Sequence, residues 1–291
     1  MTLPDFAVIG GHAADIQEAI NALDEEFGPV AGSPLYEAIQ RDDEEMVRRT
    51  SLQVQGLPTL GPKKEAILKG RTDFLKLLLE KDDLIGEEMV AAACDRKDRD
   101  SIRILLGYGW PINRPVNFAA SLLCIAVNDA QFTQWLIENG ADVNARSRHD
   151  ESALSVAIVR GSMDVVRLLL SYRTDITHGD LLHCAAQRKN QAEGAELVEH
   201  LAQKGAVVNA YRFDNPTAFR WRATFKLPTP LHVACDEGNL PVAQALVRHG
   251  ADPHRKMLEA GRLTQPTPLD KALESNNGAL IDFLRATNLS S

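Results

Sequence analysis

Side chains suited to molecular recognition are concentrated in one stretch of the sequence, residues 211–227. This stretch holds five of the chain's 16 aromatic residues and four basic residues against one acidic residue. Aromatic rings and guanidinium groups are enriched at the hot spots of protein interfaces, and loop insertions often carry function. We therefore predict that it contacts a partner through Tyr211, Arg212, Phe213, Phe219, Arg220, Trp221 and Arg222. The alternative is that the rings fold back as a satellite core over neighbouring elements, and both roles can coexist.

Two further stretches carry clusters of basic residues. One holds Arg146 and Arg148, and the other holds Arg255 and Lys256. We add these four residues to the predicted partner-binding set, although scattered charges can also form an ordinary solvated surface of mixed sign. Stacking of residues 220–222 on nucleic-acid bases is a further alternative. The net charge of −8 argues against nucleic acid as the main partner.

Residues that would support catalysis or metal binding are few and scattered. His183 and His232 have no Asp, Glu or Cys at metal-ligand spacing. The sequence also has no phosphate-binding glycine loop, nucleophile elbow or zinc-binding helix motif. We therefore expect no metal, no cofactor and no catalytic activity. The alternative is a small-molecule-binding protein or enzyme, with a pocket formed by the 211–227 insertion in which His183, His232, Asp236 and Arg222 converge.

Cysteine spacing and hydropathy bear on the compartment of the protein. The four cysteines are widely spaced without a CxxC pair, which favours buried thiols in a reducing compartment; they are Cys94, Cys124, Cys184 and Cys235. No apolar run approaches the roughly 20 residues of a membrane helix, and the N-terminus lacks the pattern of a secretory signal. We expect a cytoplasmic or nuclear protein without membrane insertion.

The elements that must position these residues repeat along the chain. One unit begins Thr-Pro-Leu-His-Val-Ala-Cys at residues 229–235 and closes with Gly-Ala-Asp at 250–252. Related openings occur at 152–157 and 267–272, and related endings occur at 140–145 and 205–210. These residues resemble the ankyrin repeat, a unit of about 33 residues built as a turn and two antiparallel helices. Eight units in phase cover residues from about 33 to 285, starting near 33, 61, 88, 121, 152, 180, 229 and 267.

The residue types at each position of the unit support this assignment. Proline suits the first helical turn, where its missing N–H costs nothing and a preceding Ser or Thr can cap the helix. A small residue at the sixth position lets neighbouring helices approach closely; it is Ala38, Ala66, Ala93, Ala126, Ala157, Ala185, Ala234 and Ala272. No unit can bury its Leu/Val stripe alone, so stacking must supply the core. We predict an all-α, ankyrin-like helical repeat solenoid with short finger hairpins.

Unit spacing predicts where the solenoid departs from regularity. The first two intervals, from 33 to 61 and from 61 to 88, are short and predict blunt turns. The interval from 180 to 229 is long, because unit six has about four extra residues near 191–194 and is followed by the insertion at 211–227. An enlarged finger is expected near residues 254–266.

The acidic residues are concentrated at the N-terminus. Residues 1–50 contain 11 acidic and three basic residues, and the remaining residues sum to zero charge. Because solenoids need end units with a polar outer face, we predict that residues 1–32 form an acidic cap or partial repeat. The repeat solenoid would then span residues 33–291.

The family resemblance also implies a function. Ankyrin-like stacks bind protein partners through inner helices and finger tips, and their finger tips line up along one edge. Basic tips in the C-terminal half would then steer an acidic partner segment toward that end. The resemblance implies that His183 and His232 make structural hydrogen bonds in the turn. We expect a monomeric, non-catalytic scaffold or adaptor that binds a partner with an acidic or aromatic segment.

Overall fold

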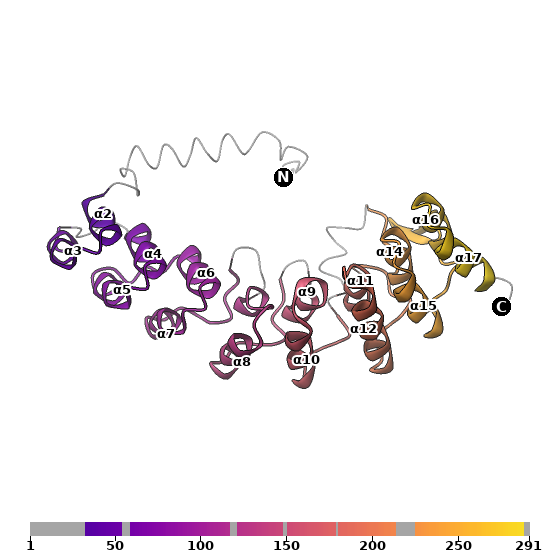
Figure 1. Cartoon of the computed structure of the whole chain (residues 1–291), viewed down its shortest axis with the longest axis horizontal. Helices are drawn as coiled ribbons and strands as arrows, with labels where there is room; N and C mark the ends of the chain where they lie inside the picture. Colours follow the sequence, from indigo (N-terminus) through magenta and orange to yellow (C-terminus); the bar gives the residue numbers. More distant parts are fainter. Residues whose placement is uncertain are drawn as a thin grey trace. The chain divides into compact units, whose positions relative to one another are not determined.

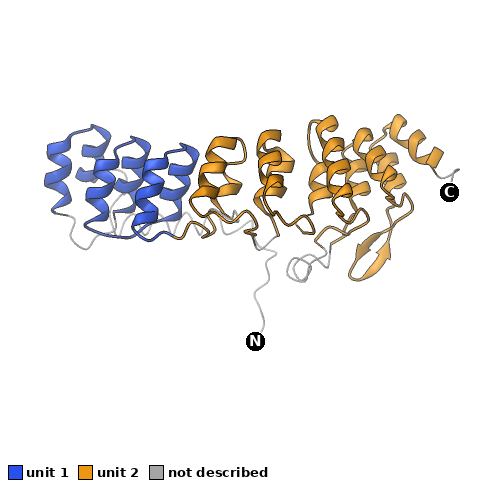
Figure 2. Ribbon diagram, turned by 90° about the horizontal axis from the view of Figure 1, so that it is seen from below, with its two compact units in different colours: residues 1–110 blue, residues 111–291 orange. Residues whose placement is uncertain are grey.

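The computed structural model describes residues 33–53, 59–116, 121–147, 150–178, 180–213 and 225–287. The chain divides into two compact units, residues 1–110 and 111–291 (Figure 2). The predicted acidic cap at residues 1–32 lies outside the described residues. None of the helices in the described ranges is long and apolar enough to cross a membrane.

Unit 1 is built from helix pairs. In its described part they are α2 (Pro34–Gln40) with α3 (Glu44–Ser51), α4 (Leu60–Leu68) with α5 (Thr72–Leu79), and α6 (Glu87–Asp95) with α7 (Arg99–Gly107). The first helices stack in the order α2, α4, α6, and α5 packs against α7 (Figure 1). Residues 80–86 connect the second pair to the third without a strand, as the short spacing predicted.

Unit 2 continues the same pattern. Its described pairs are η1 (Leu122–Cys124) with α8 (Ala130–Glu138), α9 (Ala153–Arg160) with α10 (Met163–Ser171), α11 (Leu181–Ala186) with α12 (Gln191–Gln203), α14 (Pro230–Asp236) with α15 (Leu240–Arg248), and α16 (Pro268–Glu274) with α17 (Gly278–Thr287). The first helices η1, α9, α11, α14 and α16 stack in sequence order, and α12 packs against α15. We call the side formed by these first helices the inner-helix face. The eight predicted repeats and the all-α repeat fold are confirmed.

The predicted irregularities of unit 2 are also present. The extra residues of the sixth repeat lengthen α12, which begins at Gln191 and runs for 13 residues. The enlarged last finger is a two-stranded antiparallel hairpin of β1 (Met257–Glu259) and β2 (Arg262–Thr264), visible beside α14 and α16 in Figure 1. Leu258 of β1 also exchanges backbone hydrogen bonds with Leu227 at the end of the insertion. The insertion therefore begins and ends against stacked repeats.

Local sequence explains where the first helices begin. Thr267 caps α16 by accepting a hydrogen bond from the Asp270 N–H, and Asp270 in turn accepts from the Thr267 N–H. Pro268 occupies the first helical turn, where no N–H is needed. Ser33 and Pro34 play the same roles in α2. The predicted function of the Ser/Thr-Pro opening is confirmed at these positions.

The fourth repeat, which starts near residue 121, differs from the prediction. Its first helix shortens to the 3₁₀ turn η1, and Ser121 makes no side-chain capping bond. The opening has no proline, and β-branched Ile125 and Val127 follow within one turn. This repeat therefore lacks both the capping bond and the proline that are present at the start of α2 and α16.

The core follows the predicted small-residue positions. All eight alanines at the sixth position are at most 6% exposed, and they lie where first helices of adjacent units meet. The Leu/Val stripes of the second helices are buried as well; in α10 and α15 they comprise Val165, Val166, Leu169, Val242 and Leu246. Close helix packing therefore fixes the inner-helix face that carries the candidate site.

Candidate partner-binding surface

The first residue of the insertion is held by the last finger. The Tyr211 ring is only 8% exposed, and its hydroxyl donates to the Lys256 carbonyl oxygen over 3.0 Å. The guanidinium of Arg255 lies 4.9 Å from the centre of that ring, in cation–π contact. Tyr211 and Arg255 therefore pack against each other, whereas the Lys256 side chain is exposed. Their roles in partner binding stay predictions.

The next two residues, Arg212 and Phe213, are hydrogen-bonded to residues of the sixth repeat. The Arg212 N–H donates to the Pro228 carbonyl over 2.8 Å, and its Nη2 donates to Gln187 Oε1 over 3.2 Å. The Phe213 N–H donates to the carboxylate of Asp180, with the nearer oxygen at 3.0 Å. The Arg212 guanidinium also lies 5.2 Å from the centre of the Phe213 ring. Arg212 Nε is buried and makes no hydrogen bond within the described residues.

Arg146, one of the basic residues predicted in the finger of the fifth repeat, is paired with carboxylates. Arg146 pairs with Asp150 at 2.9 Å and with Asp175 at 2.7 Å. Asp175 lies one repeat further along the chain, so the sequence of one finger could not reveal this pairing. The remaining predicted contact residues, Arg148, Phe219, Arg220, Trp221 and Arg222, lie outside the described residues.

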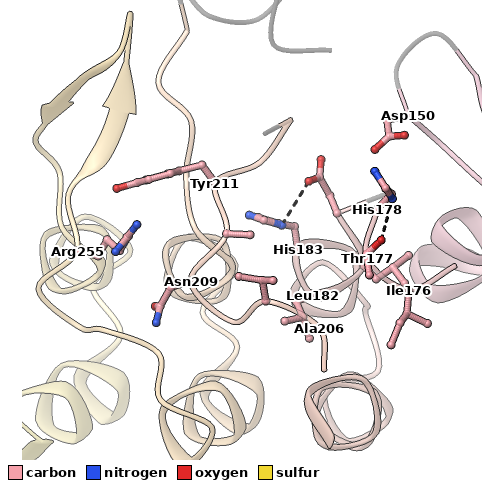
Figure 3. A pocket seen from close by; sticks show the side chains of 14 residues that line it. Asp150, Ile176, Thr177, His178, Leu182, His183, Ala206, Asn209, Tyr211 and Arg255 are labelled. Carbon is pink, nitrogen blue, oxygen red and sulfur yellow. Dashed lines mark hydrogen bonds and ion pairs between the residues drawn. The ribbon is translucent and has the colours of Figure 1, made fainter. Parts of the chain in front are cut away.

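Unit 2 has two pockets that lie beside the consecutive residues Tyr211 and Arg212. The inner pocket, about 380 Å³, lies on the inner-helix face and is lined by residues that include Gln187, Arg212, Lys226, His232, Asp236 and Glu237. The finger pocket, about 320 Å³, is lined by residues that include Asp150, His178, Asp180, His183, Tyr211 and Arg255 (Figure 3). The four residues proposed for a catalytic pocket do not all converge, because His183 lines the finger pocket whereas His232 and Asp236 line the inner one. Arg222 is outside the described residues.

The inner pocket is lined by three cations and three carboxylates, so its formal charges sum to zero. Lys271 is shared by two of the carboxylates, pairing with Asp236 at 3.2 Å and with Glu274 at 2.9 Å. In the part of the chain that the structure describes, neither Arg212 nor Lys226 forms an ion pair. These two side chains are therefore the groups of the pocket that can pair with anionic groups of a ligand.

Both motif histidines are neutral structural groups. His183 Nε2 donates to the Pro228 carbonyl at 3.1 Å, and His232 Nε2 donates to the Pro266 carbonyl at 3.0 Å. Burial lowers the pKa of His183 to about 3 and that of His232 to about 4. Across the described ranges, no three His, Cys, Asp or Glu side chains gather at metal-binding distance.

Sequence reasoning missed three residues that shape this surface. Lys226 lies near the end of the insertion and follows Phe225, which is 58% exposed. Gln187 holds the Arg212 side chain, and Asp180 holds the Phe213 backbone. The one available signal was at Asp180, because the Thr-Pro opening expected for the sixth repeat is replaced there by Asp180-Leu181.

Comparisons with known proteins agree with this architecture. A model described as "Ankyrin repeats (3 copies)" matches residues 88–180 and 121–212, and one described as "Ankyrin repeat" matches residues 229–257. Together these matches cover more than half of the 291 residues. The chain is 29% identical over 249 residues to human ankyrin repeat and SOCS box protein 16, covering 76% of this chain and 50% of that protein.

Two further similarities complete the comparison. The chain is 31% identical over 169 residues to the mitochondrial disaggregase of Bos taurus, covering 58% of this chain and 23% of that protein. It thus spans half or less of the length of these relatives. Among solved structures, it is similar to the human ASB11 ankyrin repeat domain, with a TM-score of 0.54 and 23% identity, covering 77% of this chain and 96% of that one. This last similarity concerns the fold alone.

Proposed function

Since the chain belongs to the ankyrin repeat family, whose repeats are protein-interaction units, we propose that it is a non-catalytic scaffold or adaptor. It binds an acidic segment of a partner protein at the inner pocket. Arg212 and Lys226 receive the partner's carboxylates, and the exposed ring of Phe225 offers an apolar contact beside them.

The observation that carries this proposal is the incomplete bonding of Arg212. Its backbone and one Nη are engaged, but the buried Nε–H has no acceptor in the described chain. An unsatisfied buried donor costs about 1–3 kcal/mol. The guanidinium itself lines the inner pocket, where its planar fork can pair with a partner carboxylate through two parallel hydrogen bonds.

The test begins with synthetic peptides of defined charge. Twelve-residue peptides of matched length, each with one phenylalanine and either a negative, zero or positive net charge, are titrated against the full chain by fluorescence anisotropy. We expect acidic peptides to bind most tightly, and their affinity to fall as salt concentration rises. A preference for neutral or basic peptides, or no binding of any acidic peptide, contradicts the proposal.

Variants then locate the site. The double substitution Arg212→Gln with Lys226→Gln should weaken the best acidic peptide about tenfold, since each charge-assisted contact contributes on the order of 0.5–1 kcal/mol at a partly exposed site. The matched control is Lys189→Gln with Lys204→Gln, which removes the same charge from exposed residues outside the inner pocket. Equal losses in both double variants would mean that only net charge matters.

The location of the protein is a separate proposal. Cys94, Cys124, Cys184 and Cys235 are all buried and none of them forms a disulfide bond, as expected for a chain that folds in a reducing compartment. We propose a cytoplasmic or nuclear location, to be checked by imaging a fluorescently tagged chain; accumulation in the secretory pathway would contradict it.

A further inference from the structure

The hairpin of the last finger has one edge that no described strand covers. Its strands β1 and β2 pair antiparallel, with Leu258 opposite Leu263. On the other side of β1, Leu258 exchanges backbone hydrogen bonds with Leu227, at 2.7 and 3.1 Å. β1 therefore lies between Leu227 and β2, and β2 is the outer strand of the hairpin that projects from unit 2 in Figure 2.

The register fixes where the backbone groups of Leu263 point. In an antiparallel pair, residues opposite each other alternately exchange both backbone hydrogen bonds or none. Because the N–H and C=O of Leu258 are bonded to Leu227, Leu258 and Leu263 form a pair without mutual bonds. The N–H and C=O of Leu263 therefore point away from β1, to the outer edge, where no described residue donates to them or accepts from them.

The side chain of Leu263 is the uncovered end of an apolar row. Residues directly opposite each other in neighbouring strands share one face of the sheet, so Leu227, Leu258 and Leu263 form a single row. Leu227 is 2% exposed and Leu258 is partly buried, whereas Leu263 is 62% exposed. The edge of β2 thus combines an exposed apolar side chain with a backbone N–H and C=O that are available for pairing.

The charges of this finger indicate which strand suits the edge. Residues 254–266 contain three Lys or Arg residues and one acidic residue. Arg262 precedes Leu263 and is exposed, and it forms no ion pair within the described residues, Glu259 opposite it in β1 included. Opposite charges on directly facing residues stabilise the pairing of two strands. A strand with an acidic residue opposite Arg262 therefore complements β2.

The surroundings of β2 favour a partner segment over a second copy of this chain. Two β2 strands paired through Leu263 would place Arg262 opposite Thr264, so no charge pair would form. Three residues from each copy also bury far less than the roughly 1,000 Å² of a stable interface. Pro266, by contrast, lies two residues beyond β2 and lines the inner pocket, so a segment bound in that pocket can continue along β2.

We propose that the acidic partner segment continues from the inner pocket as an extended strand along the outer edge of β2. Its residue opposite Leu263 is apolar and exchanges two backbone hydrogen bonds with Leu263, and an adjacent acidic residue faces Arg262. The identity of the segment rests on the proposed function, whereas the edge itself is defined by the hairpin.

The test uses designed twelve-residue peptides as probes on the full chain. One half carries four acidic residues for the inner pocket, the other alternates valine with threonine around one glutamate, and both orders of the halves are used. All valines of such a strand direct their N–H groups to the same edge, and the threonines direct theirs away from it. N-methylation of the valines should therefore weaken binding at least about tenfold, whereas N-methylation of the threonines, the matched control, should change it little.

Hydrogen exchange supplies a local readout of the pairing. The amide of Leu263 should become protected when the unmodified probe binds, because its N–H then has an acceptor. An unchanged exchange rate at saturating probe, or equal losses from the two methylated probes, overturns the inference.

Variants of Leu263 test the edge from the protein side. Leu263→Pro removes the outward N–H but no hydrogen bond between β1 and β2, and proline is tolerated at such an edge position; the affinity for the probe should fall at least about tenfold. Leu263→Thr keeps the N–H and should lose about threefold. The control Leu52→Thr makes the same side-chain change at a leucine of unit 1 that is 64% exposed. Unchanged affinity in the Leu263 variants, or an equal loss in the control, overturns the inference.

The double variant Arg212→Gln with Lys226→Gln separates this inference from the proposed function. If only that double variant loses affinity, the proposed function stands and the strand pairing is overturned. If only the Leu263 variants lose affinity, the pairing is supported and the proposed function fails. A dimer that forms without probe and is abolished by Leu263→Pro would assign the edge to a second copy and overturn the inference.

Discussion

Replacing Arg188 should destabilise unit 2 more than replacing any exposed arginine. Its guanidinium is buried in the turn after α11 and reaches back to the end of α9, where Nη1 donates to the Ile158 carbonyl at 2.6 Å and Nη2 to the Gly161 carbonyl at 3.0 Å. Nε pairs with Glu193 of α12 at 2.7 Å. One side chain thus joins the last turn of α9 to the first turn of α12.

The expected magnitude follows from what truncation leaves behind. Arg188→Met keeps the apolar stem but removes the donors, so at least two buried carbonyls and the Glu193 carboxylate lose their partner. Each unsatisfied group costs about 1–3 kcal/mol, and breaking a buried ion pair typically costs about 3–5 kcal/mol. We expect a loss of about 3–5 kcal/mol in the free energy of unfolding. Arg188→Lys should lose about half of that, because an ammonium cannot span the separated acceptors.

Urea unfolding of the full chain, followed by circular dichroism, measures the change. Because the chain divides into two compact units, the unfolding curve is fitted with a separate transition for residues 111–291 wherever two transitions are resolved. The matched control is Arg248→Met, which breaks an exposed pair with Glu199 and should cost less than about 1 kcal/mol. A loss below 1 kcal/mol for Arg188→Met, or equal losses in the two variants, would refute the reasoning.

Three further predictions concern packing, pH and thiol reactivity. Gly161→Ala should destabilise the chain by about 1–3 kcal/mol in urea unfolding, since an added Cβ meets backbone atoms at 2.7 Å, whereas Gly107→Ala, with open space around it, should change stability little. The free energy of unfolding should fall as pH drops below about 6.5, because the neutral His183 and His232 of the folded state become protonated only on unfolding. The slope reaches at most about 1.4 kcal/mol per pH unit for each histidine; His232→Gln should reduce it, and a flat profile between pH 6.5 and 4.5 would contradict the assignment. Native thiols should resist a thiol-specific chromogenic reagent until urea unfolds the chain, because burial raises the pKa to about 12 for Cys94, Cys184 and Cys235; rapid labelling of the native protein would contradict this.

The repeat itself could be read from the sequence because its determinants are local. A Thr-Pro opening, an alanine five residues after the first position and a Gly-Ala-Asp ending act within one unit, so each copy reports on the fold independently. The same locality explains why the short first helix of the fourth repeat was not predicted. There the pattern survived at the buried positions Leu122 and Ala126, but the capping chemistry that extends a first helix did not.

The candidate site was less accessible to sequence reasoning because its determinants span repeats. Arg146 was expected to present a positive charge, yet its carboxylate partner Asp175 follows 29 residues later, on the equivalent turn of the next unit. Tyr211 was predicted to contact a partner or to fold back over neighbouring elements, and in the structure it is buried, with its hydroxyl donating to the carbonyl of Lys256, 45 residues away. Residue type at one position cannot report such pairings, because they depend on how adjacent units stack.

Buried cations show how polar residues join turns and helices within a repeat and between repeats. Lys63 in unit 1 is fully buried, donates to the Leu84 carbonyl at 2.9 Å and pairs with Asp82 at 3.0 Å, beyond the following helix α5. Arg188, in the sixth repeat, donates to the Ile158 carbonyl of the fifth repeat. Desolvation opposes each cation, and burial lowers the pKa of Lys63 despite the carboxylate beside it. Each cation is buried where backbone carbonyls and a carboxylate converge. The partners of Lys63 lie in its own repeat, whereas Arg188 reaches carbonyls of the preceding repeat. A repeat that stacked wrongly there would leave the Arg188 guanidinium buried without these acceptors, so its desolvation favours the native stacking.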